Sequence, residues 1–282
     1  MRLANKVNLR NLLLCILMLG FFLRIEAQRG IEIGGHIGTS MYFGDLNNGF
    51  SFKLPGATAG ADIRYNFDER LCLKTSLNYV FIRGNDKFSA NLFEKARNLH
   101  FINHLGEFNA QLEMNFLTYK HGSKDQWYTP YLFLGGGVMM HGPRAKYDGH
   151  WYSLRNLGTE GQRKGNEYSI VAGSWLFGLG FKMDVSTSWS LNIDLSCRQA
   201  FTDYLDDVST NYVEIDQIEA DRGPIAAALS DPSILIPGYN DSKIGVAGRQ
   251  RGDKDRKDAF STLTVGLLYY FGQVRCPDIL NH

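Results

Sequence analysis

The chain has 282 residues, with 30 lysines and arginines against 29 aspartates and glutamates, and a formal net charge of +1. This near balance argues against a nucleic-acid partner, which would favour a strong excess of basic residues. Glycine is abundant at 30 residues and aromatic residues make up 13% of the chain, whereas proline is scarce at 7.

The first predicted element is a secretory signal peptide over residues 1–27. Basic residues, Arg2 and Arg10 among them, precede the apolar run LLLCILMLGFFL, and the small residue Ala27 stands at the expected cleavage site. The run has about 12 residues, fewer than the ~20 that a helix needs to cross a bilayer. Cys15 follows leucines rather than small residues, so we expect no lipidation and predict that the chain is exported.

Period-two alternation then predicts β-strands with one apolar and one polar face. In WSLNIDLSCR, residues 189–198, Leu191, Ile193 and Leu195 alternate with polar side chains. The segment YTPYLFLGGGVMMH at 128–141 alternates poorly. The eight predicted strands span about 31–43, 56–67, 71–82, 104–119, 128–141, 167–185, 189–202 and 259–272.

The lengths of these strands and of their connections predict an all-β fold, an eight-stranded antiparallel transmembrane β-barrel over residues 28–272. A tilted strand needs roughly 9–11 residues to cross a bilayer, and outer-membrane barrels alternate short periplasmic turns with long extracellular loops. Aromatic residues cluster at strand ends, as interface girdles do. We therefore expect a protein of the cell outer membrane in contact with lipids. Short turns are predicted at 67–70, 120–127 and 186–188, and longer loops at 44–55, 83–103, 142–166 and 203–258.

The polar strand faces predict a filled barrel interior. Eight strands leave just enough room for side chains, and buried charges must be paired. We therefore expect an ion-pair network rather than an open pore, with a small channel as the alternative. The predicted network comprises Asp62, Arg64, Lys74, Glu107, Glu113, Lys182, Asp184, Asp194 and Arg198.

The segment FTDYLDDVSTNY, residues 201–212, places Asp203, Asp206 and Asp207 where the seventh strand ends. Three interpretations compete: a solvated extracellular acidic rim that structures the loop, a calcium site, and a barrel protease that uses acids at this rim. No histidine lies in residues 203–258, and the protease barrels that this arrangement resembles have ten strands. The rim interpretation is the preferred one.

Other motifs are weaker. GGG at 135–137 lacks the lysine and hydroxyl residue of a phosphate-binding loop, and no cofactor motif is found. RGD at 251–253 lies in a predicted loop and suggests a surface adhesin as a further alternative. Within the long loop, Pro224 precedes an alanine-rich run, which predicts a short helix near 224–230 that lies over the barrel mouth as a lid.

Several segments in this order resemble the PorG family of the Bacteroidota type IX secretion apparatus. They are EIGGHIGTSMYFGDLN, IRYNFDERLCLKTSLNYV, RNLHFINHLGEFNAQLEMNFL, YDGHWYSLRNLGTEGQ and FTDYLDDVSTNY, between Ile31 and Phe271. The resemblance implies a small, non-enzymatic outer-membrane barrel that anchors or caps the periplasmic ring of that machine and contacts the ring lipoprotein. It implies no particular partner residues.

The predicted periplasmic side supplies the candidate contact surface. It includes a charged patch in the turns, and a polar tail at 273–282 that follows the barrel. Cys72, Cys197 and Cys276 are too widely spaced for a disulfide framework, although Cys276 could contribute a periplasmic contact or disulfide. The turn patch comprises Asp68, Glu69, Arg70, Lys120, His121, Lys124 and Asp125. The candidate partner contacts are Trp127, Lys124, Asp125, Cys276, Ile279 and Leu280.

Overall fold

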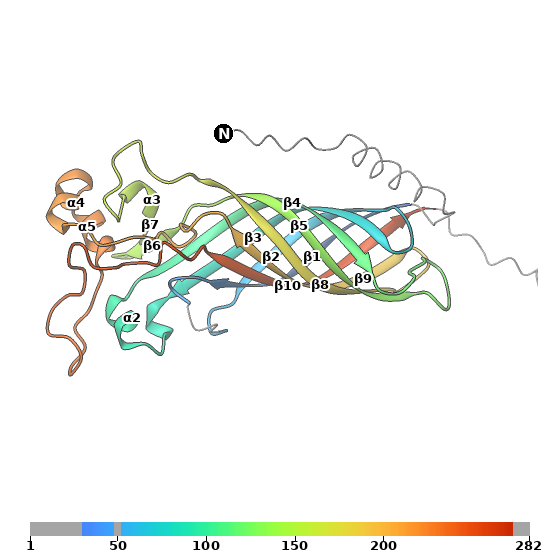
Figure 1. Ribbon diagram of the computed structural model, residues 1–282, viewed down its shortest axis with the longest axis horizontal. Helices are drawn as coiled ribbons and strands as arrows, with labels where there is room; N and C mark the ends of the chain where they lie inside the picture. Colours follow the sequence, from blue (N-terminus) through green and yellow to red (C-terminus); the bar gives the residue numbers. More distant parts are fainter. Residues whose placement is uncertain (1–29, 48–51, 273–282) are drawn as a thin grey trace, which may run out of the picture.

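Eight antiparallel strands close into a barrel in the computed structural model, which describes residues 30–47 and 52–272 (Figure 1). The barrel closes where β10 pairs with β1 from Ile31↔Phe271 to Phe43↔Ala259. The predicted eight-stranded fold is therefore confirmed. The barrel strands are β1 (Gly30–Phe43), β2 (Gly56–Asn66), β3 (Leu71–Asn85), β4 (His100–Asn115), β5 (Tyr128–Met140), β8 (Val171–Asp184), β9 (Trp189–Ala200) and β10 (Ala259–Phe271).

The strand ends differ from the predicted ones mainly in β4 and β8. β4 starts at His100 and ends at Asn115, four residues before each predicted bound, because residues 116–119 leave the sheet and Tyr119 turns into the barrel mouth. β8 starts at Val171 instead of residue 167. The predicted signal peptide and C-terminal tail, with Cys276, Ile279 and Leu280, lie outside the described residues.

The outer face of the barrel is an apolar belt. In β9, Ile193 and Leu195 are exposed whereas Asn192 is 3% exposed, so the predicted register is correct. Soluble proteins rarely expose contiguous apolar patches of this extent, but a bilayer requires such a surface. The chain is therefore a transmembrane barrel of the outer-membrane type. The belt includes Ile37 of β1, Ile63 of β2, Leu77 of β3, Phe108 of β4, Leu134 of β5, Leu179 of β8, Leu195 of β9 and Leu263 of β10.

β5 alternates poorly because two aromatic side chains point inward. Tyr131 and Phe133 are buried, at 0% and 5% exposure. Room for them comes from the neighbouring strand, where a Cβ atom at Gly180 or Gly178 would lie 2.5 Å from the Tyr131 or Phe133 ring. Glycine is thus required on β8 by the close approach of the β5 rings.

The long loops fold together at one end of the barrel into a cap, which we define as residues 44–47, 52–55, 86–99, 141–170 and 201–258 (Figure 1). A buried apolar cluster joins the cap to the barrel, since Leu205, Val208 and Leu229 of the cap share it with inward-facing strand residues such as Tyr42 and Ile82. The cap elements are η1 (Asp86–Phe88), α2 (Leu92–Arg97), β6 (Arg144–Tyr147), β7 (His150–Ser153), α3 (Leu154–Leu157), α4 (Ile215–Arg222) and α5 (Pro224–Ser230).

The cap contains a helix that the sequence predicted and a hairpin that it did not predict. The predicted helix at 224–230 is confirmed as α5, which begins at Pro224 and buries Leu229 against the barrel mouth. The β6–β7 hairpin was missed, although Asp148-Gly149 is a turn pair typical of hairpins and both residues have positive φ, 44° and 81°. In the described part of the chain, no helix is long and apolar enough to cross a membrane.

Candidate functional site

The interior of the barrel between the cap and the short turns holds a network of ion pairs centred on Glu113. Arg64 Nε lies 2.9 Å from Glu113 Oε2, Lys182 Nζ 3.3 Å from the same oxygen, and Lys74 Nζ 3.6 Å from Oε1. Lys74 also pairs with Asp194 at 2.6 Å. Three strands, β2, β3 and β8, thus direct their cations at one carboxylate on β4, in agreement with the predicted network.

Two smaller groups complete the network nearer the cap. Asp62 Oδ2 lies 2.7 Å from His36 Nδ1, and its other oxygen accepts a hydrogen bond from Ser76 at 2.5 Å. Arg198 Nε donates to Glu107 Oε1 at 2.8 Å. Charges of opposite sign therefore meet on neighbouring and facing strands, which is the condition for burying them.

Glu32 belongs to this network, and the sequence analysis missed it. It is fully buried, and its Oε2 accepts a hydrogen bond from Arg64 Nη1 at 2.9 Å. The signal was present, because Glu32, His36 and Ser40 share the even-numbered face of a strand whose odd positions are mostly apolar. Glycines at the positions between them obscured the alternation.

The barrel mouth at the short turns is closed by the 116–127 segment. Asp184 lies here as predicted, where it accepts hydrogen bonds from the Tyr119 hydroxyl and from the Gly122 amide at 2.9 Å. His121, expected in an exposed charged patch, is 4% exposed, so that prediction is wrong. Its ring stacks on Tyr270 at 4.2 Å between centroids.

Two carboxylates hold His121 in this position. Its Nδ1 lies 2.9 Å from Asp184 Oδ1 and its Nε2 lies 3.2 Å from Glu32 Oε1. Burial lowers the pKa of His121, but the hydrogen bonds and charges of Asp184 and Glu32 outweigh burial and raise it above the ordinary value. His121 therefore seals the mouth as part of the network instead of facing a partner.

The remaining predicted contact residues of this end are exposed. Lys124 and Asp125 lie at the surface of the turn. Trp127, at 40% exposure, packs edge-on against Tyr128 with ring centroids 4.9 Å apart, and Tyr128 lies 5.9 Å from Phe181. Trp127 thus belongs to a row of aromatic rings at the edge of the apolar belt, the position of an interface girdle.

The acidic segment 201–212 is not a solvated rim. Asp203, Asp206 and Asp207 are 3%, 1% and 0% exposed, so the predicted exposure is wrong. Tyr42 donates a hydrogen bond to Asp206 at 2.5 Å, and Ser209 donates to Asp203 at 2.7 Å. The acids face into the cap because hydroxyl and amide donors surround them there, and they structure this loop as the preferred interpretation also expected.

Burial changes the proton affinity of these acids. It raises the pKa of Asp203 to about 7 and that of Asp207 to about 7, although Arg251 and the Thr159 hydroxyl partly oppose the effect at Asp207. Burial and the neighbouring carboxylates raise the pKa of Asp206 and Asp258 well above the usual range for aspartate. Among residues 30–47 and 52–272, no group of three or more His, Cys, Asp or Glu side chains could hold a metal ion.

Two buried arginines cross-link the cap. Arg97 pairs with Asp86 at 2.8 Å and donates to the Asp45 carbonyl at 2.8 Å. Arg251 pairs with Glu160 at 3.1 Å and is 2% exposed. The RGD tripeptide therefore cannot present its arginine to an adhesion receptor in this conformation.

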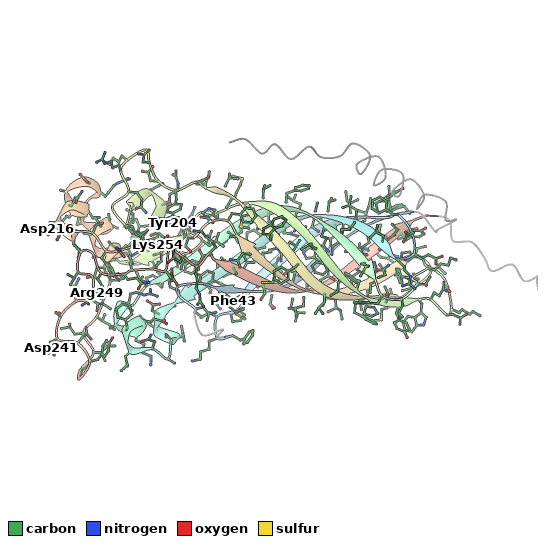
Figure 2. All side chains as sticks on the ribbon, viewed as in Figure 1. Phe43, Tyr204, Asp216, Asp241, Arg249 and Lys254 are labelled. Carbon is green, nitrogen blue, oxygen red and sulfur yellow. The ribbon has the colours of Figure 1, made fainter. Side chains whose placement is uncertain are left out.

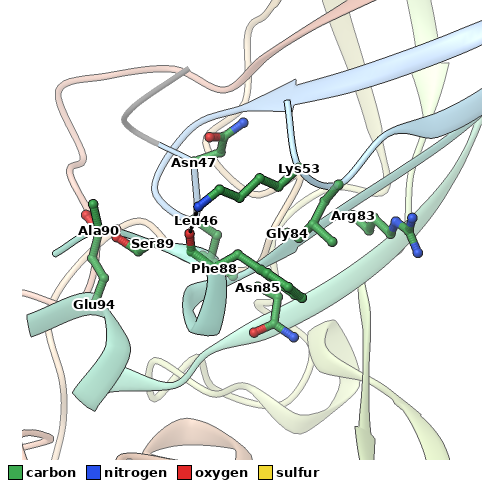
Figure 3. A pocket seen from close by; sticks show the side chains of 11 residues that line it. Leu46, Asn47, Lys53, Arg83, Gly84, Asn85, Phe88, Ser89, Ala90 and Glu94 are labelled. Carbon is green, nitrogen blue, oxygen red and sulfur yellow. Dashed lines mark hydrogen bonds between the residues drawn. The ribbon is translucent and has the colours of Figure 1, made fainter. Parts of the chain in front are cut away.

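A pocket of about 330 Å³ lies at the base of the cap, where the loop after β1 meets the end of β3 (Figure 3). Its wall includes Leu46, Arg83 and Phe88, and Lys53 donates a hydrogen bond across it to the Phe88 carbonyl at 3.2 Å. Phe43, the last residue of β1, is labelled in Figure 2 at the end of the barrel, where the cap begins.

A family model described as a domain of unknown function (DUF6089) matches residues 10–219. No curated protein matches the chain in sequence.

Three solved structures are similar to the chain at low identity. The attachment invasion locus protein Ail of Yersinia pestis is 11% identical with a TM-score of 0.38, over 88% of this chain and 100% of that chain. The outer membrane protein OprG of Pseudomonas aeruginosa is 12% identical with a TM-score of 0.43, over 88% and 98%. Neisserial surface protein A is 10% identical with a TM-score of 0.41, over 87% and 100%.

Proposed function

The chain belongs to the DUF6089 family, and from that premise we propose that it is a non-enzymatic outer-membrane barrel that anchors or caps the periplasmic ring of the type IX protein secretion apparatus. Its partner would be the ring lipoprotein. The proposal rests on the sequence resemblance given above and on the filled interior of the barrel. Because the interior is filled, a partner would bind to the outer surfaces.

The filled interior is the observation that carries this proposal. Arg64, Glu113 and Lys182 are fully buried at the centre of the barrel, the His121 segment closes one mouth, and the cap closes the other. A barrel packed in this way has no room for a folded polypeptide or for free diffusion of a solute. We expect no stable conductance in planar bilayers, and open-channel currents at neutral pH would favour the channel alternative.

The buried acids of the cap support the non-enzymatic part of the proposal. Asp206 and Asp207 each accept a hydrogen bond from a tyrosine, Tyr42 and Tyr168, at 2.5 Å and 2.7 Å. A general base must reach its substrate or a catalytic water, and these carboxyl groups lie beneath the cap surface. Asp206→Asn and Asp207→Asn therefore leave secretion intact, provided that the variants fold.

The short-turn end is the surface that we propose for the ring. Lys124 and Asp125 are exposed there, next to a girdle that holds the turn at the membrane surface. Charged groups of this kind orient a partner, whereas affinity requires additional buried anchors. Trp127 and the tail at 273–282 are the candidates for these anchors.

Site-specific photo-crosslinking tests the proposed face in cells. A photo-reactive amino acid at Lys124 or Asp125 should crosslink to the ring lipoprotein, whereas one at Asp241 or Lys243, exposed in the cap, should not. Deletion of 275–282 combined with Trp127→Ala should reduce co-purification while the barrel stays heat-modifiable. Crosslinks from the cap positions alone would place the working surface at the opposite end.

The cap favours a second candidate function, recognition outside the cell. Its loops form an ordered unit with a common apolar cluster, which a loop with only a linking role does not need. Cells with a cap truncated at 232–246 should then lose surface attachment while secretion continues. A loss of secretion with attachment unchanged would argue against an adhesin.

A further inference from the structure

The outer sheet surface continues past the apolar belt along β3, β4 and the β6–β7 hairpin. Arg83 of β3 pairs with Ile102 of β4, which in turn pairs with Arg144 of β6. Residues that face each other across paired strands project from the same side of the sheet. His104 faces outward, and Ile102 lies two residues away on the same strand, so it faces the same way. The two arginines that pair with Ile102 therefore project from the outer side of the sheet.

The hairpin extends this surface by two further side chains. Lys146 pairs with Trp151 across β6 and β7, two residues from Arg144, and thus shares its face. The opposite face of the hairpin is turned to the protein, where Ala145 is 2% exposed and Tyr152 packs against the cap cluster. The lysine, by contrast, is exposed, and Trp151 is 48% exposed.

These cations have no acidic partners within the described residues. Arg83, Arg144 and Lys146 are exposed, and none of them forms an ion pair with a carboxylate in residues 30–47 and 52–272. The acidic residue nearest to them in the hairpin is Asp148 at its tip, in the turn. We define Arg83, Arg144, Lys146 and Trp151 as the basic ledge.

The height of the basic ledge relative to the membrane follows from the strands. Tyr79 and Phe81, whose rings both contact His104 of β4, are the last outward-facing aromatic residues of β3 before the cap. Phe81 pairs with His104, and Arg83 is two residues farther along β3. Two residues advance a strand by roughly 6–7 Å, and the headgroup layer on each side of a bilayer is about 5–8 Å thick. Arg83 and Arg144 therefore lie in the headgroup layer, and Lys146 and Trp151, two residues farther along the hairpin, lie just above it.

We propose that the basic ledge binds the phosphorylated sugar headgroup of a glycolipid in the outer leaflet. Guanidinium groups match phosphate oxygens in a bidentate geometry, and the lysine adds a point charge. Trp151, which pairs with Lys146 just above the arginines, supplies an amphipathic ring suited to the apolar face of a sugar. The acyl chains of the same molecule lie along the belt below the ledge.

The spacing of the cations favours a glycolipid over a phospholipid. Arg83 on β3 and Arg144 on β6 flank Ile102 of β4 from opposite sides, so their backbones are separated by about two strand spacings, or roughly 10 Å. A disaccharide with a phosphate at each end spans such a distance, whereas a phospholipid offers one phosphate.

Binding of bisphosphorylated lipid A to the full-length protein in nanodiscs tests this proposal. The triple variant Arg83→Gln, Arg144→Gln and Lys146→Gln should weaken binding at least roughly tenfold, because each charged hydrogen bond is worth about a factor of ten or more. Trp151→Ala should weaken it less. Lipid A should also raise the temperature of heat modification in the native protein and not in the triple variant.

A matched control removes the same charge elsewhere in the cap. Arg163, Lys164 and Lys243 are exposed, and the 158–167 loop packs beside α4, where Arg222 donates to the Gln162 carbonyl at 2.7 Å. Their triple glutamine variant should bind lipid A as the native protein does. Equal weakening by both triple variants, unchanged binding by the ledge variant, or equal binding of phosphatidylglycerol at matched charge would each overturn the proposal.

Discussion

The barrel interior and the cap bury charge in opposite ways. Inside the barrel, Glu113 is surrounded by Arg64, Lys74 and Lys182, so each buried charge meets its opposite on another strand. In the cap, Arg97 and Arg251 are the buried arginines, and carboxyl groups outnumber them. The buried acids of the cap are Asp45, Asp86, Glu160, Asp203, Asp206, Asp207, Asp231 and Asp258.

The difference is clearest at Tyr42. Its single hydroxyl proton lies between Asp206 and Asp258, whose oxygens are 2.5 Å and 2.9 Å from the tyrosine oxygen. One proton cannot serve both carboxylates, so the pair is stabilised when one of them is protonated. The barrel interior is therefore held by pairs of fixed charges, whereas the cap combines two ion-paired arginines with buried acids that retain protons.

The largest expected effect comes from breaking the barrel network at its centre. Glu113→Gln keeps the shape of the side chain but leaves three cations without their shared carboxylate. Removing one partner of a buried ion pair costs about 3–5 kcal/mol. We expect a loss of this order in the free energy of unfolding, measured by urea titration of the heat-modifiable form in detergent.

Glu219→Gln is the matched control, because Glu219 is exposed on α4. It should leave the unfolding midpoint unchanged. If Glu113→Gln were equally silent, the interior would be hydrated and its charges screened by water, and the contrast with the cap would be lost.

The next effect tests whether the cap is an independent unit. Leu229 of α5 is 3% exposed in the cluster that joins cap and barrel. Leu229→Ala should destabilise the cap by roughly 2–4 kcal/mol through lost packing and a cavity. Limited proteolysis should then cleave within 223–238, while the barrel retains its heat-modifiable migration. Simultaneous loss of both signals would show that the two regions unfold as one.

A pH titration separates the two regions without mutation. Burial raises the pKa of Asp203 and Asp207 to about 7 and that of Asp45 to about 6. Unfolded aspartate titrates near pH 4. Between about pH 4 and pH 7 the folded cap therefore binds more protons than the unfolded chain does. This stabilisation is fully present below about pH 4 and is lost as the pH rises to about 7.

Hydrogen exchange of the cap amides, compared between pH 5 and pH 8 after correction for intrinsic rates, measures this effect. Protection should fall in residues 201–212 as the pH rises and change less in the centres of the barrel strands. Greater protection of the cap at pH 8 would contradict the assignment of bound protons.

The smallest expected effect comes from Asp206→Asn, which replaces a protonated carboxyl group by an amide that cannot lose its protons. In Asp206→Asn the side-chain oxygen can still accept from the Val208 amide, which lies 2.9 Å from Asp206 Oδ1. The new amide group can donate to Tyr42, whose hydroxyl then serves Asp258. We expect the cap to gain about 1 kcal/mol at pH 8 and almost nothing at pH 5, measured by the same exchange experiment. Asp216→Asn, on an exposed position of α4, is the control.

The barrel was largely predictable from the sequence because its signal is local. Alternation assigned the faces of β9 correctly, and it placed Arg64, Glu107 and Glu113 inside. α5 was predictable for the same reason, since a proline before an alanine-rich run defines a helix start within a few residues.

The partners of these side chains, by contrast, were decided by tertiary structure. His121 was expected at the surface, because nothing in KHGSKDQW shows that its ring will stack on Tyr270. Asp206 was expected in solvent, but its donor Tyr42 stands 164 positions earlier in the chain. Arg251 was read as part of an exposed tripeptide, and its partner Glu160 is 91 positions away.

The sequence by itself thus determined the strand pattern, the membrane-facing surface and the polarity of the barrel interior. These depend on the side-chain period of a strand, which is set by the backbone. Only the tertiary structure decided which charges pair, how the loops close the barrel and which acids lose contact with water. Those outcomes depend on where distant segments meet and on the cost of burying a charge there, and neither quantity is encoded within a single local segment.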